Sequence, residues 1–183
     1  MRKMIEPVGL SRRAVIAGGV ALATGAILPP AVAAQEAMLL QRVPGTPAAP
    51  EFELPDLDGK PVRFSDLKGK VVLVNFWAVW CPPCRTEIPS MERAWAKLKE
   101  AGVVVLAVHI GGDSEKIWAF LADFNVTFPV LIDKSSRVSK EWRTIGLPTT
   151  YIVDPSGRKA LRAVGGREWD QPELLASILA LKS

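Results

Sequence analysis

The chain has 183 residues, of which 49% are apolar, and it carries 23 basic and 19 acidic side chains, one histidine and two cysteines. At about 100 to 200 residues per domain, this length predicts a single domain with one core. Two cysteines are too few for a scaffold held together by several disulfides, and one histidine leaves little material for a His-rich zinc site. The composition therefore excludes both of these classes.

The basic excess is concentrated before residue 35. Only one acidic residue, Glu6, lies there, together with four basic ones: Arg2, Lys3, Arg12 and Arg13. Of the 23 basic and 19 acidic residues, 19 and 18 remain after residue 34, so the net charge of +4 falls to +1. Residues 35–183 are nearly neutral, whereas a protein that binds phosphate backbones carries a basic surface. We therefore expect no nucleic-acid partner.

Residues 1–34 have the three-part layout of an export signal. Ser11-Arg12-Arg13 is followed by an uncharged run over 14–34, in which Ala31-Val32-Ala33 offers the small side chains that a signal peptidase needs. The paired arginines after a serine resemble a twin-arginine signal, which predicts export to the periplasm. The alternative is an anchor that tethers the protein to the inner membrane, because about 20 uncharged residues span a bilayer. Pro29-Pro30 disfavours that alternative.

The rest of the sequence predicts a linker over 35–50 and a domain over 51–183. The first segment contains three prolines and little periodicity. At the start of the domain, residues 52–54 and 61–64 flank Asp58-Gly59, which predicts a short hairpin.

Two nearly continuous apolar runs, 71–77 and 103–108, predict strands that are covered on both faces. Apolar residues at steps of three and four predict a helix over 84–98 and another over 117–124. Residues 128–132 are predicted to form a third strand.

The C-terminal part predicts a hairpin and a helix. Residues 149–153 and 159–164 flank a turn at 154–157, and Asp170 with Glu173 predicts a capping box for the last helix. Strands that alternate with helices and end in a hairpin predict an α/β fold with a mixed sheet.

Both cysteines lie in the motif Cys81-Pro82-Pro83-Cys84, where strand 71–77 gives way to the first helix. One helical turn brings the two thiols within disulfide distance. Cys81 would face the positive end of the helix dipole, which favours its thiolate, so we expect Cys81 to attack and Cys84 to resolve. Structural zinc would need a second ligand pair, and a disulfide across so short a loop would stabilise little. The motif therefore predicts a redox-active disulfide.

The segment NFWAVWCPPCRTEIP, together with GLPTTYIVD from Gly146, resembles the TlpA/ResA group of thiol-disulfide oxidoreductases in the thioredoxin superfamily. The resemblance extends from about Pro50 to the C-terminus. It implies a thioredoxin-like fold with a central mixed β-sheet flanked by helices, an N-terminal β-hairpin extension and a central βα insert near 117–128. It also implies an enzyme that exchanges disulfides with client proteins, and we expect no cofactor and no metal.

The resemblance also implies roles for individual residues. Pro148 matches a cis-proline that would lie beside Cys81, and the main chain of Leu147 would pair with an extended client segment. Trp80 is expected to shape the client-binding surface. Glu87 matches a family carboxylate that handles the proton of the deeper thiol. The alternatives are an ordinary turn proline and a solvated helix glutamate.

Asn75 departs from thioredoxins proper, which have an aspartate at this strand position. Because asparagine cannot accept a proton, Glu87 would have to be the general base, and burial that raised its pKa towards neutrality would help it.

Neither Pro82 nor Pro83 has an N–H to stabilise a Cys81 thiolate, which favours a reductase over a strong oxidant. The resemblance allows apocytochrome c, copper-site proteins or general disulfide-bearing clients, with a transmembrane electron donor of the DsbD or CcdA type.

Two other functions compete with disulfide exchange. A peroxidase of the peroxiredoxin type needs Thr or Ser three residues before its reactive cysteine and Pro four residues earlier still, but Ala78 and Val74 stand there. A copper-delivery module would use Cys81, Cys84 and His109, which are ligands suited to Cu(I).

Overall fold

The structure is a computed structural model that describes residues 40–112 and 114–182. The export signal or anchor predicted over 1–34 lies outside the described residues. Within the described ranges, no helix has both the length and the apolar character that a membrane crossing requires.

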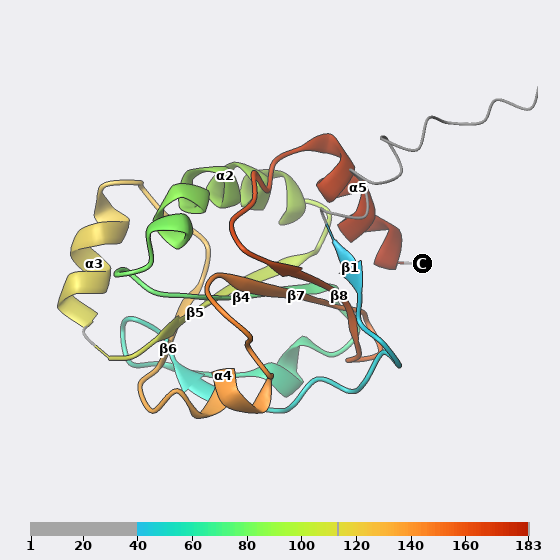
Figure 1. The fold of residues 1–183 in the computed structure, drawn as a ribbon, viewed down its shortest axis with the longest axis horizontal. Coiled ribbons are helices and arrows are strands. Elements are labelled where there is room, and N and C mark those ends of the chain that lie inside the picture. Colours follow the sequence, from blue (N-terminus) through green and yellow to red (C-terminus); the bar gives the residue numbers. More distant parts are fainter. Residues whose placement is uncertain (1–39, 113, 183) are drawn as a thin grey trace, which may run out of the picture.

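Six strands form one mixed sheet in the order β1-β8-β7-β4-β5-β6 (Figure 1). They are β1 (Gln41–Arg42), β4 (Val72–Trp77), β5 (Val104–Ile110), β6 (Val130–Asp133), β7 (Thr149–Val153) and β8 (Lys159–Val164). β4 pairs parallel with β5 and antiparallel with β7, which places it inside the sheet. All of its residues are buried, as expected for an apolar run that is covered on both faces.

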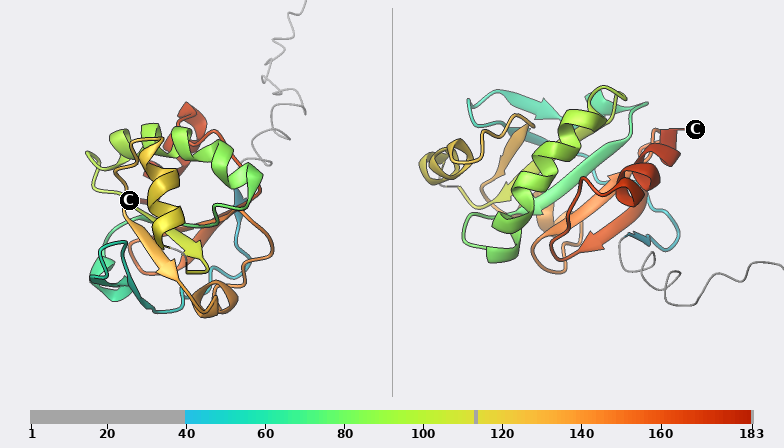
Figure 2. Two further views of the ribbon diagram at one scale, coloured as in Figure 1. Left: turned by 90° about the vertical axis from the view of Figure 1, so that its left-hand side faces the viewer. Right: turned by 90° about the horizontal axis from the view of Figure 1, so that it is seen from above.

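Helices cover both faces of this sheet, so the predicted architecture is confirmed. The helices are α2 (Pro82–Leu98), α3 (Ser114–Ala122), α4 (Arg137–Glu141) and α5 (Pro172–Leu179), with the 3-10 helices η1 (Phe64–Leu67) and η2 (Ala180–Lys182). In Figure 1, α2, α3 and α5 lie on one side of the sheet, and α4 lies on the other side. The hairpin of β2 (Glu53–Pro55) and β3 (Pro61–Arg63) packs on the α4 side, as Figure 2 also shows.

The two faces of β4 point into two separate cores. Leu73 and Trp77 belong to the core beneath α2, α3 and α5, whereas Val74 and Phe76 belong to the core beneath α4 and the hairpin. Because side chains alternate along a strand, Asn75 shares the face of Leu73 and Trp77. The strand therefore presents one polar side chain to α2.

Two local predictions differ from the structure. Residues 41 and 42, within the predicted linker, form the edge strand β1 against β8. The predicted capping box at the last helix was wrong, because Gln171 is the N-cap of α5 and makes no side-chain cap bond. The Asp170 carboxylate instead accepts a hydrogen bond from Arg93 Nε of α2 at 2.6 Å. Pro172 at the helix start lacks an N–H, which reduces the need for a cap.

Trp142 ties the hairpin to the sheet. Its indole is fully buried, and Nε1 donates to the Pro50 carbonyl oxygen at 3.1 Å. Its ring lies with centroid separations of 5.3 to 6.0 Å from the rings of Phe52, Phe64, Phe76 and Tyr151. Because these rings come from the hairpin side and from two sheet strands, one side chain joins the two parts.

Truncating this ring is expected to loosen the hairpin. Trp142→Ala should lower the free energy of unfolding by about 3 to 5 kcal/mol, the usual cost of deleting a buried large aromatic ring. Trp118→Ala is the matched control and should cost much less, because Trp118 is 48% exposed. Urea denaturation of both disulfide-bonded variants measures the difference. Equal losses would mean that Trp142 does not anchor the hairpin.

Candidate active site

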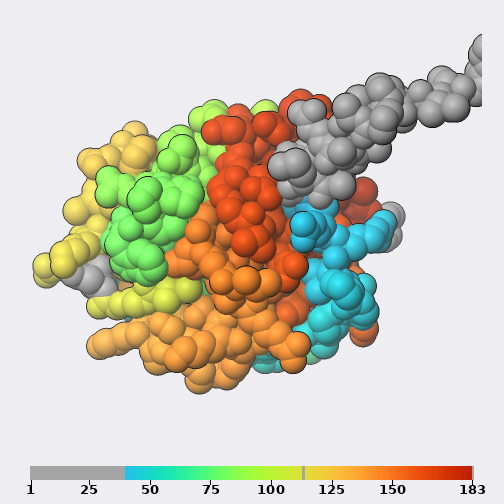
Figure 3. Space-filling view, in the orientation of Figure 1, coloured from blue at the N-terminus to red at the C-terminus, as the bar shows by residue number. Residues whose placement is uncertain are grey.

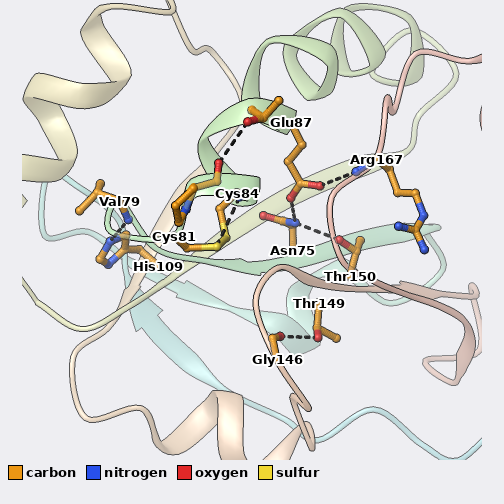
Figure 4. The surroundings of a disulfide bond; sticks show 12 residues. Asn75, Val79, Cys81, Cys84, Glu87, His109, Gly146, Thr149, Thr150 and Arg167 are labelled. Atoms are coloured by element: carbon orange, nitrogen blue, oxygen red, sulfur yellow. Dashed lines mark hydrogen bonds between the residues drawn. A yellow bond between two sulfur atoms is a disulfide. The ribbon is translucent and has the colours of Figure 1, made fainter.

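The two cysteines form a disulfide at the start of α2 (Figure 4). Cys81 is the N-cap residue of the helix, and the Cα atoms of the pair are 5.3 Å apart. Cys81 is 4% exposed and Cys84 is fully buried, so Cys81 is the more accessible sulfur. The amide of Cys84 donates to Cys81 Sγ at 3.4 Å. An N–H that points at the first sulfur at a helix N-terminus is suited to stabilising a thiolate there.

The loop before β7 reaches the same edge of the sheet as the disulfide. β7 runs antiparallel to β4, with Thr149 paired to Phe76, so the start of one strand lies beside the end of the other. The Leu147–Pro148 peptide bond is cis. Among the described residues, Leu147 forms no main-chain hydrogen bond, so its N–H and C=O are available to an added strand.

Two exposed apolar side chains are close in sequence to the residues at this edge. Trp80 directly precedes Cys81 and is 68% exposed, and Ile145 precedes Leu147 by two residues and is 69% exposed. In Figure 3, the start of α2 (green) adjoins the segments before β7 and after β8 (orange to red) on one face. Sequence analysis missed Ile145, because an isolated apolar residue in a loop has no recognisable pattern.

Glu87 lies one turn after Cys84 on α2 and is 2% exposed, which rules out a solvated helix glutamate. Asn75 Nδ2 donates to its Oε1 at 2.8 Å. The Trp169 indole Nε1 and the Arg167 amide donate to its Oε2 at 3.0 and 3.1 Å. Three donors from distant parts of the chain thus hold one buried carboxylate.

Burial raises the pKa of Glu87 from 4.5 to about 7, because desolvation disfavours the charged form. The hydrogen bonds from Trp169, Asn75 and the Arg167 amide oppose this shift without cancelling it. Glu87 can therefore take up and release a proton near neutral pH, which a general base needs to do.

The loop that follows β8 closes over this carboxylate. Ser90 Oγ accepts from the Trp169 amide at 3.1 Å, and its single O–H lies within donating distance of the Glu87 and Arg167 carbonyl oxygens, at 2.8 and 3.2 Å. Gly166 comes so close to α2 that an added Cβ would lie 3.1 Å from the Pro83 carbonyl oxygen. A cleft of about 310 Å³ remains between this loop and the start of α2; its lining residues include Pro83, Thr86, Glu87 and Arg167. This cleft connects Glu87 with the surface.

Three contributors to the site had no signal in the sequence. Thr150, Arg167 and Trp169 lie 75 to 82 residues from their partners in the chain. Only the folded chain brings them together. Thr150 belongs to the segment GLPTTYIVD, but nothing in that segment marks it as a partner of Asn75, and Arg167 and Trp169 belong to no recognisable motif.

His109 is held by the main chain rather than by the two sulfurs. Its Nε2 accepts from the Val79 amide at 3.1 Å, and its Nδ1 lies 3.2 Å from the Gly111 carbonyl oxygen. The ring packs edge-on against Trp77, at 5.1 Å between centroids. Within residues 40–112 and 114–182, no three His, Cys, Asp or Glu side chains form a group that could hold a metal ion. The ligand set of the copper alternative is therefore not assembled.

The positions that a peroxidase would require are apolar. Ala78 and Val74 are both fully buried. Ala78 provides no hydroxyl group three residues before Cys81, so the structure offers the cysteine no side-chain donor from that position.

A cis-proline loop and a disulfide at the start of a helix, both at one edge of a mixed sheet covered by helices, define a protein of the thioredoxin-like class. The sequence profile of the AhpC/TSA family matches residues 46–159, more than half of the chain. The chain belongs to this family.

Curated relatives refine the comparison. The chain is 39% identical over 118 residues to the thiol-disulfide oxidoreductase ResA of Bacillus subtilis, a match that covers 64% of this chain and 65% of the relative. A ResA of Bacillus cereus is 35% identical over 125 residues, with coverages of 68% and 72%. The chain thus spans 65% of the B. subtilis relative's length. The predicted resemblance to the TlpA/ResA group is confirmed.

Solved structures agree with this fold. A thiol:disulfide interchange protein DsbE from Chlorobium tepidum superposes with a TM-score of 0.69 at 36% identity, covering 75% of this chain and 97% of that one. A second interchange protein of the thioredoxin family from the same species gives a TM-score of 0.65 at 28% identity, with coverages of 73% and 97%. The predicted thioredoxin-like fold is confirmed.

The stability of the protein is expected to depend on the protonation of Glu87. Between pH 4.5 and about 7, the folded protein holds a proton at Glu87 that the unfolded chain has released, so the free energy of unfolding falls as the pH rises through this window. A shift from 4.5 to about 7 corresponds to a loss of about 3 kcal/mol. Glu87→Gln should remove this component of the pH dependence.

Urea unfolding of the disulfide-bonded protein across this pH window measures the effect. Only the slope with pH is compared, because the glutamine substitution would also change the absolute stability. Parallel profiles for the two proteins would contradict a protonated, buried Glu87.

Proposed function

We propose that the protein is a thiol-disulfide oxidoreductase that reduces disulfides of client proteins outside the cytoplasm. The observation that carries this proposal is the Cys81–Cys84 disulfide at a helix N-terminus, with the buried Glu87 carboxylate one turn away. The names of the ResA and DsbE relatives support the same reaction class. The signal-like segment 1–34 supports export to the periplasm, with or without a retained membrane tether.

The reaction begins with the dithiol form. The Cys81 thiolate attacks a client disulfide, a Cys81–client sulfur bond forms, and the other client sulfur leaves and takes up a proton. Glu87 then accepts the proton of the Cys84 thiol, and the Cys84 thiolate attacks Cys81 Sγ. This second exchange forms the Cys81–Cys84 disulfide and breaks the Cys81–client bond. The second client sulfur leaves as a thiolate and takes the proton that Glu87 received from Cys84, so the client gains two electrons and two protons, the first proton from water.

The client would bind at the edge that carries the cis-proline. An extended client segment would pair with the free main chain of Leu147, next to Pro148, as an added strand. Trp80 and Ile145 would contact apolar client side chains on either side of the disulfide, because both are exposed. Apocytochrome c, copper-site proteins and general disulfide-bearing clients would each be compatible with this mode of binding.

Electron flow towards the client is supported by the residues between the cysteines. Pro82 and Pro83 have no N–H, and among the described residues the Cys84 amide is the hydrogen-bond donor to Cys81 Sγ. Modest stabilisation of the thiolate makes the dithiol a better reductant. A transmembrane electron donor of the DsbD or CcdA type would then regenerate the dithiol.

Removing the resolving thiol should trap clients. Cys84→Ser, expressed in the exported compartment, is expected to accumulate mixed disulfides through Cys81, because no internal thiol can release them. The trapped species should disappear when the extract is reduced before non-reducing electrophoresis. Cys81→Ser is the matched control and should trap little, since Cys84 is fully buried. Trapping by Cys81→Ser alone would reverse the two roles.

The reduction potential should place the protein among the reductants. Equilibration with a glutathione or dithiothreitol buffer is expected to give a value nearer to thioredoxin, about −270 mV, than to DsbA, about −120 mV. Pro83→His adds positive charge beside Cys81 and should raise the potential. A wild-type value close to that of DsbA would overturn the assignment as a reductase.

A further inference from the structure

One acceptor atom in the site has no hydrogen-bond partner in the disulfide form. Asn75 is fully buried, and among the described residues its side-chain oxygen Oδ1 has no donor. A buried amide oxygen without a donor carries the full cost of its lost hydration. Such an atom in the middle of a reaction site indicates a partner that is present in another state of the protein.

The neighbours of Asn75 fix the direction of this oxygen. Nδ2 donates to Glu87 Oε1 at 2.8 Å and to Thr150 Oγ1 at 2.9 Å, so both amide hydrogens are used. When Glu87 is ionised it can only accept, so the NH₂ end of the amide then faces Glu87. In Figure 4, Oδ1 consequently points away from Thr150 and towards Cys84.

Reduction of the disulfide creates the missing donor. In the disulfide, neither sulfur carries a hydrogen. When the disulfide takes up two electrons, the Cys84 sulfur gains a proton and becomes an S–H group, which is a weak donor. Cys84 is fully buried, so water cannot serve as its partner there. The new S–H and the orphan oxygen therefore appear in the same buried space.

We propose that Asn75 Oδ1 accepts a hydrogen bond from the Cys84 thiol in the dithiol form, and that this bond holds the proton on the resolving sulfur until Cys81 has captured a client. The inference rests on the proposed function and assigns Asn75 a place in its reaction. Asn75 joins the two groups between which the proton moves, since it accepts from Cys84 on one side and donates to Glu87 on the other. When Glu87 takes the proton and the Cys84 thiolate attacks Cys81, Oδ1 loses its donor again.

The charged groups that face this site act alongside Asn75 and must be separated from it. They are Glu87 on α2, Arg167 in the loop after β8 and, in the dithiol form, the Cys81 thiolate. Loss of the Asn75 donor would also raise the pKa of Glu87, because that hydrogen bond lowers it. An Asn75 variant thus acts on Cys84 both directly and through Glu87.

The dithiol–disulfide equilibrium with glutathione tests the direct effect. Asn75→Leu removes the oxygen, so the dithiol loses a hydrogen bond and the disulfide loses an unpaired acceptor. Both changes favour the disulfide, and we expect the equilibrium constant to shift towards it by about tenfold, which is about 30 mV for a two-electron couple. Asn75→Ala is the second variant, with the same expected direction, in case leucine does not fit.

Two controls separate the direct effect from the effect through Glu87. Trp169→Phe removes another donor to Glu87 and leaves Asn75 intact, so the shift it causes measures the effect through Glu87 alone, and the Asn75 variants should shift the equilibrium further towards the disulfide. The Asn75 substitution is then repeated in a Glu87→Ala background, where no carboxylate is present. The shift towards the disulfide should persist there, whereas an effect transmitted only by Glu87 would vanish.

Ionisation of the Cys84 thiol gives an independent measurement. In a Cys81→Ser background Cys84 is the only thiol, and its thiolate can be followed by ultraviolet absorbance. Adding Asn75→Leu should increase the ionisation constant of Cys84 by about tenfold, because the hydrogen bond to the protonated form is lost. A merely structural role of Asn75 would change stability without moving this constant.

The outcomes distinguish this inference from the proposed function. If the wild type does not exchange disulfides with glutathione at all, the proposed function fails. If it exchanges normally but the Asn75 variants change neither the equilibrium nor the Cys84 ionisation, the function stands and the inference is overturned. A shift that disappears in the Glu87→Ala background also overturns it.

Discussion

The chemistry of the site depends on the burial of the Glu87 carboxylate between α2, β4 and the loop after β8. A buried carboxylate loses its hydration. Three hydrogen-bond donors replace part of it here, from Asn75, Arg167 and Trp169. These donors hold the carboxylate in place, but they do not cancel the effect of desolvation. The pKa of Glu87 therefore rises to about 7. A carboxylate with full solvation or with a buried cation beside it would stay ionised and would make a weaker base.

The same constraint explains features of the fold that lie away from the cysteines. β4 is apolar except at Asn75, because its other inward side chains pack into two cores. The loop after β8 must stay close to α2 to deliver its two donors, and Ser90 and the absent side chain of Gly166 permit this approach. The sheet order brings the cis-proline loop to the same edge. The disulfide and the buried Glu87 carboxylate are thus positioned by elements that are far apart in the chain.

The sequence predicted the parts of this arrangement that depend on local pattern. The central strands, the first helix and the hairpin follow from runs and periods of apolar residues, and the reactive pair follows from a short motif. The two-residue strand β1 and the five-residue helix α4 are too short to show a period. At Asp170, a capping pattern was present but the carboxylate binds Arg93 across the fold, since a charged partner competes with a helix amide. Trp169 and Thr150 act through partners 82 and 75 residues away, which no local pattern encodes.

The polar groups of the site are not all satisfied in the disulfide form, and this conflict is informative. In the disulfide form, Glu87 has its donors while Asn75 Oδ1 has none. In a dithiol form, the buried Cys84 thiol would supply the missing donor. This hydrogen bond would shift the dithiol–disulfide equilibrium towards the dithiol. An apolar side chain at position 75 would remove the unpaired oxygen from the disulfide form, with the loss of one of the three donors to Glu87. It would also remove the link that we propose between the Cys84 thiol and the Glu87 carboxylate. A polar side chain on this otherwise apolar strand is explained by its donation to Glu87 and, in our proposal, by a second partner that its oxygen gains in the dithiol form.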